Sequence, residues 1–563
     1  MRTKLILLFA VAMCLFMNVA TMAQSYAITN AKIVTVSGAT IDKGTVVIRN
    51  GLIEAVGANV ATPADAQVFD ATGLTVYPGF FDALTSLGLQ ARPAAPAGGG
   101  PGGPAQAAAA AAAQAQPTSN SNYPAGLRPE DMTADDLRAG EAQFEAARNV
   151  GFTSVLTVGR AGIFNGQSAV INLAGDSVSA MTLRSPYALH VTYTTLGQAY
   201  PQSLLGTFSA IRQMFYDAKR LEDWQKAYAA NPKGMKRPDS DRSLEALFPY
   251  INGKAPVVFN ANTEREIIRS IDLIKQFKLN GVIAGGNEAW KVADRLKANN
   301  IPVLLSLNFP KRTTAAAPDA DPESIETLRL RAETPKGAGK LAAAGVKFAF
   351  QSGAATTLAD FFTNAGKAVE NGLSRDAAIR SMTLGAAEIL GLSDRVGSIE
   401  AGKIANLVLV KGDLFGRDKF VPQVIIDGKV FEQKEPVRPP QNRGSGSGNP
   451  TGAVPPTSTA APEPANISGG YAITIDVPGS PIQASMNFTQ SGASLTGTFT
   501  TDAGSSAIRN GRVTANGFSF ATTVPYGGQN LDITVQGSLA GNQISGTLDS
   551  PLGTVPFAGT KNP

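Results

Sequence analysis

Strand-like apolar runs alternate with helical patterns along the middle of the chain, and this alternation is the strongest constraint on its fold. The runs are Thr153–Val158, Ala169–Leu173, Pro256–Phe259, Gly281–Ala284, Pro302–Leu307 and Val346–Phe350. Because they are continuously apolar, they predict strands that are buried on both faces, as in a parallel sheet. Repeated strand–helix units over residues 123–395 predict a (β/α) barrel or an open doubly wound sheet.

Two of the intervening helices have recognisable ends. Thr263 to Glu266 forms a capping box, in which the Thr263 hydroxyl and the Glu266 carboxylate each accept from the backbone N–H of the other residue. Asn280-Gly281 is expected to end this helix. A second helix is expected to begin near Ser374 and to end at Gly391. Its buried side would carry Ile379, Met382, Ala386 and Ile389.

Both flanks of this region have strand patterns. Residues 26–77 contain three short runs with a hairpin signal at Asn50-Gly51, and residues 397–432 contain another at Asp427-Gly428. Residues 467–563 carry few charges and many Thr, Ser and Gly, with short alternating runs about ten residues apart. This pattern predicts a separate all-β meander, either a barrel or a sandwich. Low-complexity stretches at 92–122 and 433–466 are expected to be an insert and a linker.

Residues 1–23 have the pattern of an export signal. Arg2 and Lys4 precede the apolar run Leu5–Val19, and small residues allow cleavage before Gln24. This run is too short for a comfortable membrane span, and no other apolar run reaches about 18 residues. We therefore expect an exported protein, periplasmic or secreted, with no integral membrane span. A lipoprotein cysteine at Cys14 is the alternative, and Met13 before it is unfavourable.

Composition excludes several classes of function. Hydrophobic residues make up 43% of the chain, which excludes a mainly disordered protein. The net charge of +5 is spread over 563 residues, which disfavours nucleic-acid binding. The chain has one histidine and one cysteine, so it offers very few of the ligands from which zinc sites are built.

Several stretches together resemble one known family. They are Ala31–Val34, Ile48–Gly57, Val76–Asp82, Ala386–Leu392 and Arg395–Val410. This order of motifs resembles the amidohydrolase superfamily, particularly its imidazolonepropionase-like exported members. The resemblance implies a (β/α)8 TIM-like barrel over residues 78–396 and a small β-sandwich domain built from residues 26–77 and 397–432. The C-terminal all-β domain follows.

The resemblance also implies a metal site whose ligands are missing from this sequence. Family members hold one or two divalent metals, most often zinc, with histidines and an aspartate at the barrel strand ends. The positions that correspond to these ligands are Leu84, Ser86, Asn260, Gly285 and Gly353. None of them is a metal-binding residue, so we predict no cofactor and assign no catalytic or metal-binding residue.

Other polar residues near the predicted strand ends are candidates for lining a pocket: Asp82, His190, Asn262, Glu288, Ser306, Asn308 and Ser352. For His190 we favour a core or surface position with a backbone partner over a role as a lone general base. For Glu288 we favour a charge in the first turn of a helix over a place in the pocket. Asp82 matches the family aspartate beside the lost histidines, and we expect it in a hydrogen-bond network at the strand end.

Three functions remain open from the sequence. The first is a non-catalytic homologue that binds an unknown small molecule or pairs with a paralogous barrel protein, and oligomerisation is open. The second is a hydrolase of carbon–nitrogen bonds other than peptide bonds, with atypical ligands or a metal-free mechanism. The third is an envelope binding module whose contacts come from the C-terminal β-domain.

Overall fold

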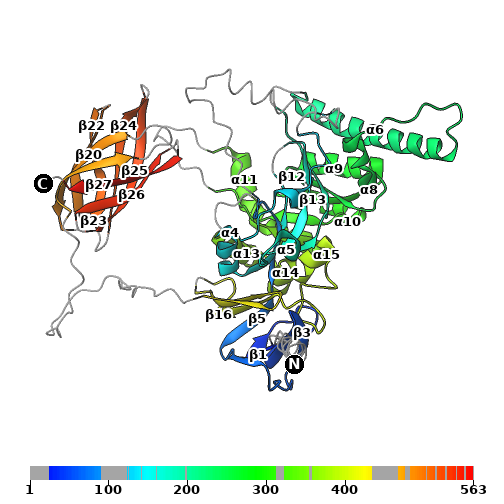
Figure 1. The fold of residues 1–563 in the computed structure, drawn as a ribbon, viewed down its shortest axis with the longest axis horizontal. Coiled ribbons are helices and arrows are strands. Elements are labelled where there is room, and N and C mark those ends of the chain that lie inside the picture. Colours follow the sequence, from blue (N-terminus) through cyan, green and yellow to red (C-terminus); the bar gives the residue numbers. More distant parts are fainter. Residues whose placement is uncertain are drawn as a thin grey trace, which may run out of the picture. The chain divides into compact units, whose positions relative to one another are not determined.

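The computed structural model describes residues 25–89, 123, 126–140, 142–159, 162–196, 200–311, 323–353, 358–416, 418–433 and 467–561, the last range with gaps at 476–481, 493, 503, 514–516, 527–528, 541 and 551–552. The chain divides into two compact units, residues 1–439 and 440–563 (Figure 1). The predicted signal at 1–23, the whole insert at 92–122 and nearly all of the linker at 433–466 lie outside the described residues.

The first unit contains a sheet that takes strands from both flanks of the barrel. The strand order is β18-β17-β16-β5-β1-β2-β3, and β4 also pairs with β1. Asn50 and Gly51, and Asp427 and Gly428, all have positive φ, as the predicted hairpins require. The bounds are β1 Ser25–Ile33, β2 Ile41–Arg49, β3 Leu52–Gly57, β4 Gln67–Asp70, β5 Leu74–Pro78, β16 Leu407–Lys411, β17 Phe420–Ile426 and β18 Lys429–Glu432.

The TIM-like barrel of the first unit confirms the predicted fold. Parallel pairing joins β6 to β7, and it runs continuously through β11, β12, β13, β14 and β15. The last strand, β15, packs against the first, β6. The bounds are β6 Phe80–Thr85, β7 Phe152–Thr157, β11 Leu189–Thr192, β12 Pro256–Ala261, β13 Asn280–Gly285, β14 Val303–Ser306 and β15 Phe348–Gln351.

One position of the barrel departs from the parallel pattern. The segment between β7 and β11 forms β8 (Phe164–Gln167) and β9 (Ala169–Asn172). Strand β9 runs antiparallel to β7, and β8 runs antiparallel to β11. The apolar run at 169–173 therefore does not have the parallel direction that we expected from its composition. The short connection from β7 explains this, because a strand that returns without a crossover helix must be antiparallel. Strand β10 (Thr182–Arg184) extends the sheet beyond β9.

The helices mostly surround the barrel strands. Their bounds are α3 Thr133–Asp136, α4 Ala142–Val150, α5 Val178–Met181, α6 Leu204–Ala230, α7 Arg242–Glu245, α8 Phe248–Ile251, α9 Glu264–Phe277, η1 Ala289–Val292, α10 Ala293–Ala298, α11 Ile325–Glu333, η2 Thr334–Lys336, α12 Gly337–Ala343, α13 Ala359–Glu370, α14 Arg375–Ser381 and α15 Leu384–Leu390. The capping box at Thr263 is present as predicted.

Two helix predictions need correction. Helix α9 ends at Phe277 and not at Asn280-Gly281, because Lys278 adopts a left-handed conformation that caps it. The helix expected over 374–391 is broken into α14 and α15 at Met382 and Thr383, although Gly391 does cap its end.

The second unit is a closed antiparallel β-barrel. Its strands follow the order β20-β19-β27-β26-β25-β24-β23-β21, pairing of β20 with β21 closes the ring, and β22 pairs outside it with β21. Aromatic residues including Phe488, Phe499 and Phe520 fill the interior. The bounds are β19 Gly469–Ile475, β20 Ile482–Ser491, β21 Ser494–Thr501, β22 Gly504–Ala507, β23 Arg509–Val513, β24 Gly517–Tyr526, β25 Gln529–Ala540, β26 Gln543–Ser550 and β27 Gly553–Lys561. Among the described residues, no helix is long and apolar enough to cross a membrane.

Candidate functional site

Alternation along the barrel strands identifies the side chains that point to the barrel axis. Ala188, Val258, Leu304 and Ala349 belong to one buried cluster, which the strands share inside the barrel, whereas Leu189 and Val191 belong to the cluster that includes residues of α6. Because successive side chains of a strand point to opposite faces, residues two positions further along point inward as well. Near the carboxyl ends these inward residues are polar: Thr192, Asn260, Ser306 and Gln351.

We call this group, together with Asn262, the collar. The register places Ala261, Gly285, Leu305 and Phe350 at one level of the barrel. Asn262, Ser306 and Gln351 each lie one residue further along and therefore share the next level. The collar stands above the apolar cluster and contains amides and hydroxyls but no charged side chain.

Asn260 is the residue that we expected at the position of the fifth-strand histidine, and its amide is already engaged. Its Nδ2 donates to Thr192 Oγ1 over 2.9 Å and is 3.5 Å from Asn165 Oδ1. Thr192 Oγ1 in turn donates to Asn165 Oδ1 over 2.5 Å. These hydrogen bonds tie β12 to β11 and to β8 and hold the Asn260 side chain against the wall of the barrel.

Gly285 is the residue that we expected at the position of the sixth-strand histidine, and its backbone disfavours any side chain there. Its φ is +89°, in the left-handed region that favours glycine. A Cβ at this position would lie 2.4 Å from Asn262 Oδ1, so the Asn262 amide occupies the space. Gly353, which we expected at the position of the eighth-strand aspartate, also has a left-handed φ of +62°.

Leu84 and Ser86, at the end of β6, are the residues that we expected at the positions of the paired histidines. Leu84 is buried among the apolar residues inside the barrel, and Ser86 follows the strand and is half-buried. Asp82, two residues before Leu84, is fully buried. Its carboxylate accepts hydrogen bonds from the Ser352 N–H over 2.8 Å and from the Ser352 hydroxyl, and it is 3.3 Å from the Leu84 N–H.

These donors do not fit a zinc ion. Zinc sites use thiolates, imidazoles and carboxylates that converge on one point, whereas the five positions where we expected the family ligands carry apolar, hydroxyl, amide and glycine residues. Within the part of the chain that the structure describes, no group of three or more His, Cys, Asp and Glu residues is placed to hold a metal. Of the amides and hydroxyls at the strand ends, those of Asn260 and Thr192 bind each other and Asn165.

His190 lies inside the barrel and is fully buried. Its Nε2 is 2.9 Å from Ser168 Oγ, so its partner is a side chain and not the expected backbone group. Its Nδ1 has no partner. Burial lowers the pKa of His190 to about 3, so the ring is neutral. This Ser–His pair lacks the carboxylate that would orient the imidazole in a triad, and it is closed to solvent.

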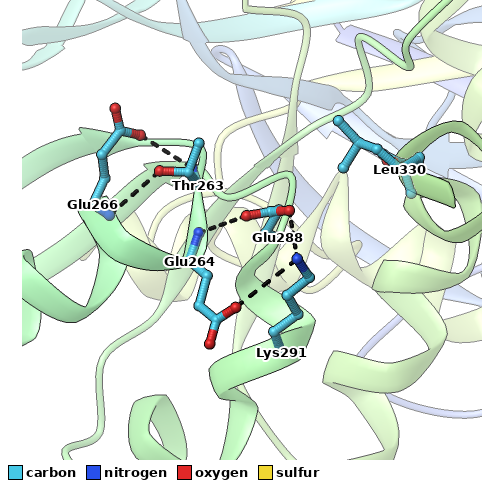
Figure 2. A network of polar contacts seen from close by, with 7 residues as sticks. Thr263, Glu264, Glu266, Glu288, Lys291 and Leu330 are labelled. Atoms are coloured by element: carbon cyan, nitrogen blue, oxygen red, sulfur yellow. Dashed lines mark hydrogen bonds and ion pairs between the residues drawn. The ribbon is translucent and has the colours of Figure 1, made fainter. Parts of the chain in front are cut away.

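Glu288 lies after β13 and supports the neighbouring helix (Figure 2). Its carboxylate accepts the Glu264 N–H at the start of α9 over 2.7 Å and the Lys291 ammonium over 2.6 Å. Burial disfavours its charge, but these two hydrogen bonds outweigh burial and bring the pKa of Glu288 below its ordinary value. This network accounts for the residue without a role in the collar.

Sequence reasoning named Ser306, Asn308 and Ser352 but missed Gln351. Asn308 is exposed, and its backbone N–H donates to Ser306 Oγ over 3.1 Å. Gln351 is 2% exposed, and its Nε2 donates to Leu304 O over 3.1 Å. An inward glutamine two residues after Ala349, in an otherwise apolar strand, was the signal available in the sequence.

The structure also contains a surface hollow of about 250 Å³, which is lined by residues of α6 and α9 and by Ile251 and Asn252. Its lining mixes lysines with acidic residues, and Glu222 in it is already paired with Lys226. It is formed by the outer helices and includes no collar residue.

Comparison with known proteins identifies the family. Residues 269–431 match the model of the amidohydrolase family. The structure is similar to that of an amidohydrolase from Thermotoga maritima MSB8, with 27% identity, a TM-score of 0.59, and coverage of 72% of this chain and 100% of that one. These two matches support the assignment of the chain to the amidohydrolase superfamily.

Further solved structures resemble this amidohydrolase-superfamily chain at lower levels. A prolidase complexed with N-methylphosphonate-L-proline is 18% identical, with a TM-score of 0.45 and coverage of 73% of this chain and 100% of that one. Phenylurea hydrolase B is 16% identical, with a TM-score of 0.43 and coverage of 72% and 97%. A search of curated proteins found no match.

Proposed function

We propose that this chain is an exported, non-hydrolytic member of the amidohydrolase superfamily that binds a small molecule at the mouth of its barrel. The observation that carries the proposal is the hydrogen bonding of Asn260 to Thr192, beside a left-handed Gly285. Where the family needs free ligands, this chain has an engaged amide and a glycine.

The loss of hydrolysis follows from the chemistry of the family reaction. A bound divalent metal lowers the pKa of water to about 7 and polarises the scissile carbonyl. The collar has neither metal ligands nor a titratable group that could activate water in place of the metal. His190 is the only imidazole in the chain and is sealed below the collar.

The test is the metal content of the mature protein, measured by elemental mass spectrometry. The protein is purified without chelators or a histidine tag and measured before and after incubation with zinc. We expect metal well below one ion per chain in both samples and no hydrolysis of cyclic amides or dipeptides. A stoichiometric metal ion together with metal-dependent turnover would overturn the proposal in favour of an atypical hydrolase.

A further inference from the structure

One atom of the collar has a hydrogen-bonding requirement that the protein leaves unmet. Gln351 Oε1 is buried and has no partner. The orientation of the amide is fixed, because Nε2 donates to Leu304 O, and a flipped amide would set two acceptor oxygens against each other. A buried acceptor without a donor is costly, so this atom indicates that a donor group binds beside it.

The space beside Gln351 Oε1 is the space that a side chain at residue 353 would enter, and residue 353 is a glycine. A Cβ on Gly353 would lie 3.3 Å from Gln351 Oε1 and 3.6 Å from Ser306 Oγ. Both polar atoms therefore border the space in which the family aspartate would stand. Ser306 Oγ accepts from the Asn308 N–H, and its own proton remains available to donate.

These two atoms define the chemistry of the group that fits between them. The group must donate to Gln351 Oε1, which only accepts, and it must accept from the Ser306 hydroxyl. A hydroxyl group does both. Asn262, whose exposed amide lies at the same level of the barrel, offers a donor and an acceptor to a second hydroxyl.

Charge further restricts the ligand. The collar contains no cation that would balance an anionic ligand. Asp82, the nearby carboxylate, is fully buried and already accepts from Ser352, so it does not balance a cationic ligand. Because an unbalanced charge in such a site is costly, an uncharged ligand is favoured.

We propose that the collar binds a neutral polyol, with one hydroxyl between Gln351 and Ser306 in the place of the lost aspartate. This inference rests on the proposed non-hydrolytic function and names the class of molecule that the site takes.

Isothermal titration calorimetry on the full mature chain tests the proposal, with glucose and myo-inositol as neutral probes. Gluconate and protonated glucosamine are their charged counterparts. We expect at least one neutral probe to bind and both charged compounds to bind at least tenfold more weakly. Equal binding of the charged compounds, or no binding of either neutral probe, overturns the proposal. In the second case, a water molecule is the hydrogen-bond donor to Gln351 Oε1.

Two variants locate the binding. Gln351→Met removes the acceptor at similar side-chain size, and Ser306→Ala removes the hydroxyl with little risk to folding. Each should weaken binding at least tenfold, whereas Gln213→Met, on the exposed face of α6, should not. Unchanged binding in Ser306→Ala overturns the proposal even if Gln351→Met fails to fold.

Metal content measured on the same samples separates the two claims. Stoichiometric metal with turnover contradicts the proposed function, whereas a metal-free protein that binds no polyol contradicts this inference alone.

Discussion

The Asp82 carboxylate on the first barrel strand accepts the backbone N–H of Ser352, just after the last strand, over 2.8 Å. The Ser352 hydroxyl donates to the same carboxylate. No ladder pairing joins β6 to β15 among the described residues, so these hydrogen bonds connect the two strands where the barrel closes. Asp82, which we matched to the aspartate beside the metal ligands in the family, therefore connects the first and last strands of the barrel. We call this junction the seam.

Replacing Asp82 with alanine should destabilise the first unit by about 3 kcal/mol, because the Ser352 N–H and hydroxyl lose their acceptor while still buried. Urea denaturation measures the free energy of unfolding. Asp176→Ala is the matched control, because that carboxylate is 95% exposed in an ion pair with Lys429 and should contribute little. Equal effects of the two variants would contradict the role of Asp82 in the seam.

Gly285→Ala should lower the free energy of unfolding by about 1–2 kcal/mol, because an L-residue is strained at a φ of +89°. Gly402→Ala serves as control, since Gly402 has a φ of +87° and open space around it. The Gly285 variant should cost up to about 1 kcal/mol more, because the Asn262 side chain must leave its rotamer. Combining it with Asn262→Ala should remove that excess, as measured by a double-mutant cycle on thermal unfolding.

The stability of the first unit should fall as the pH drops from 6.5 towards 3. The pKa of His190 is about 3 when folded against 6.5 for a free imidazole, so within this window only the unfolded chain is protonated. The contribution of His190 should lower the free energy of unfolding by about 1.4 kcal/mol for each unit by which the pH falls. The comparison is with His190→Gln, whose profile should lack this slope. Parallel profiles would show that His190 titrates alike in both states.

Phe499→Ala should destabilise the C-terminal barrel by about 3–5 kcal/mol, because it empties a position that is 1% exposed. Differential scanning calorimetry should show the unfolding transition of the C-terminal barrel shifted and that of the first unit unchanged. Phe361→Ala, at an equally buried position of the first unit, should shift the other transition. A common shift of both transitions in either variant would contradict independent unfolding of the two units.

Most of the fold was predictable because its signals are local. The capping box at Thr263 and the hairpin at Asn50-Gly51 depend on neighbouring residues and occur as expected. The direction of β9 and the end of α9 were not predicted, since a short return connection and a left-handed Lys278 decide them.

Little of the candidate site could be predicted from the sequence. The single histidine of the chain is the reason that the sequence predicts no imidazole cluster. The hydrogen bonds among the candidate residues join residues far apart in sequence. Asn165 and Asn260 are 95 residues apart, and Asp82 and Ser352 are 270 apart, so no local pattern could have paired them.

The left-handed backbone at Gly285 has a consequence for any attempt to build a metal site at this end of the barrel. A histidine introduced at 285 alone would be strained, and its Cβ would lie 2.4 Å from Asn262 Oδ1. A designer would therefore have to change the conformation at the end of β13 and replace Asn262 before a ligand could be placed there.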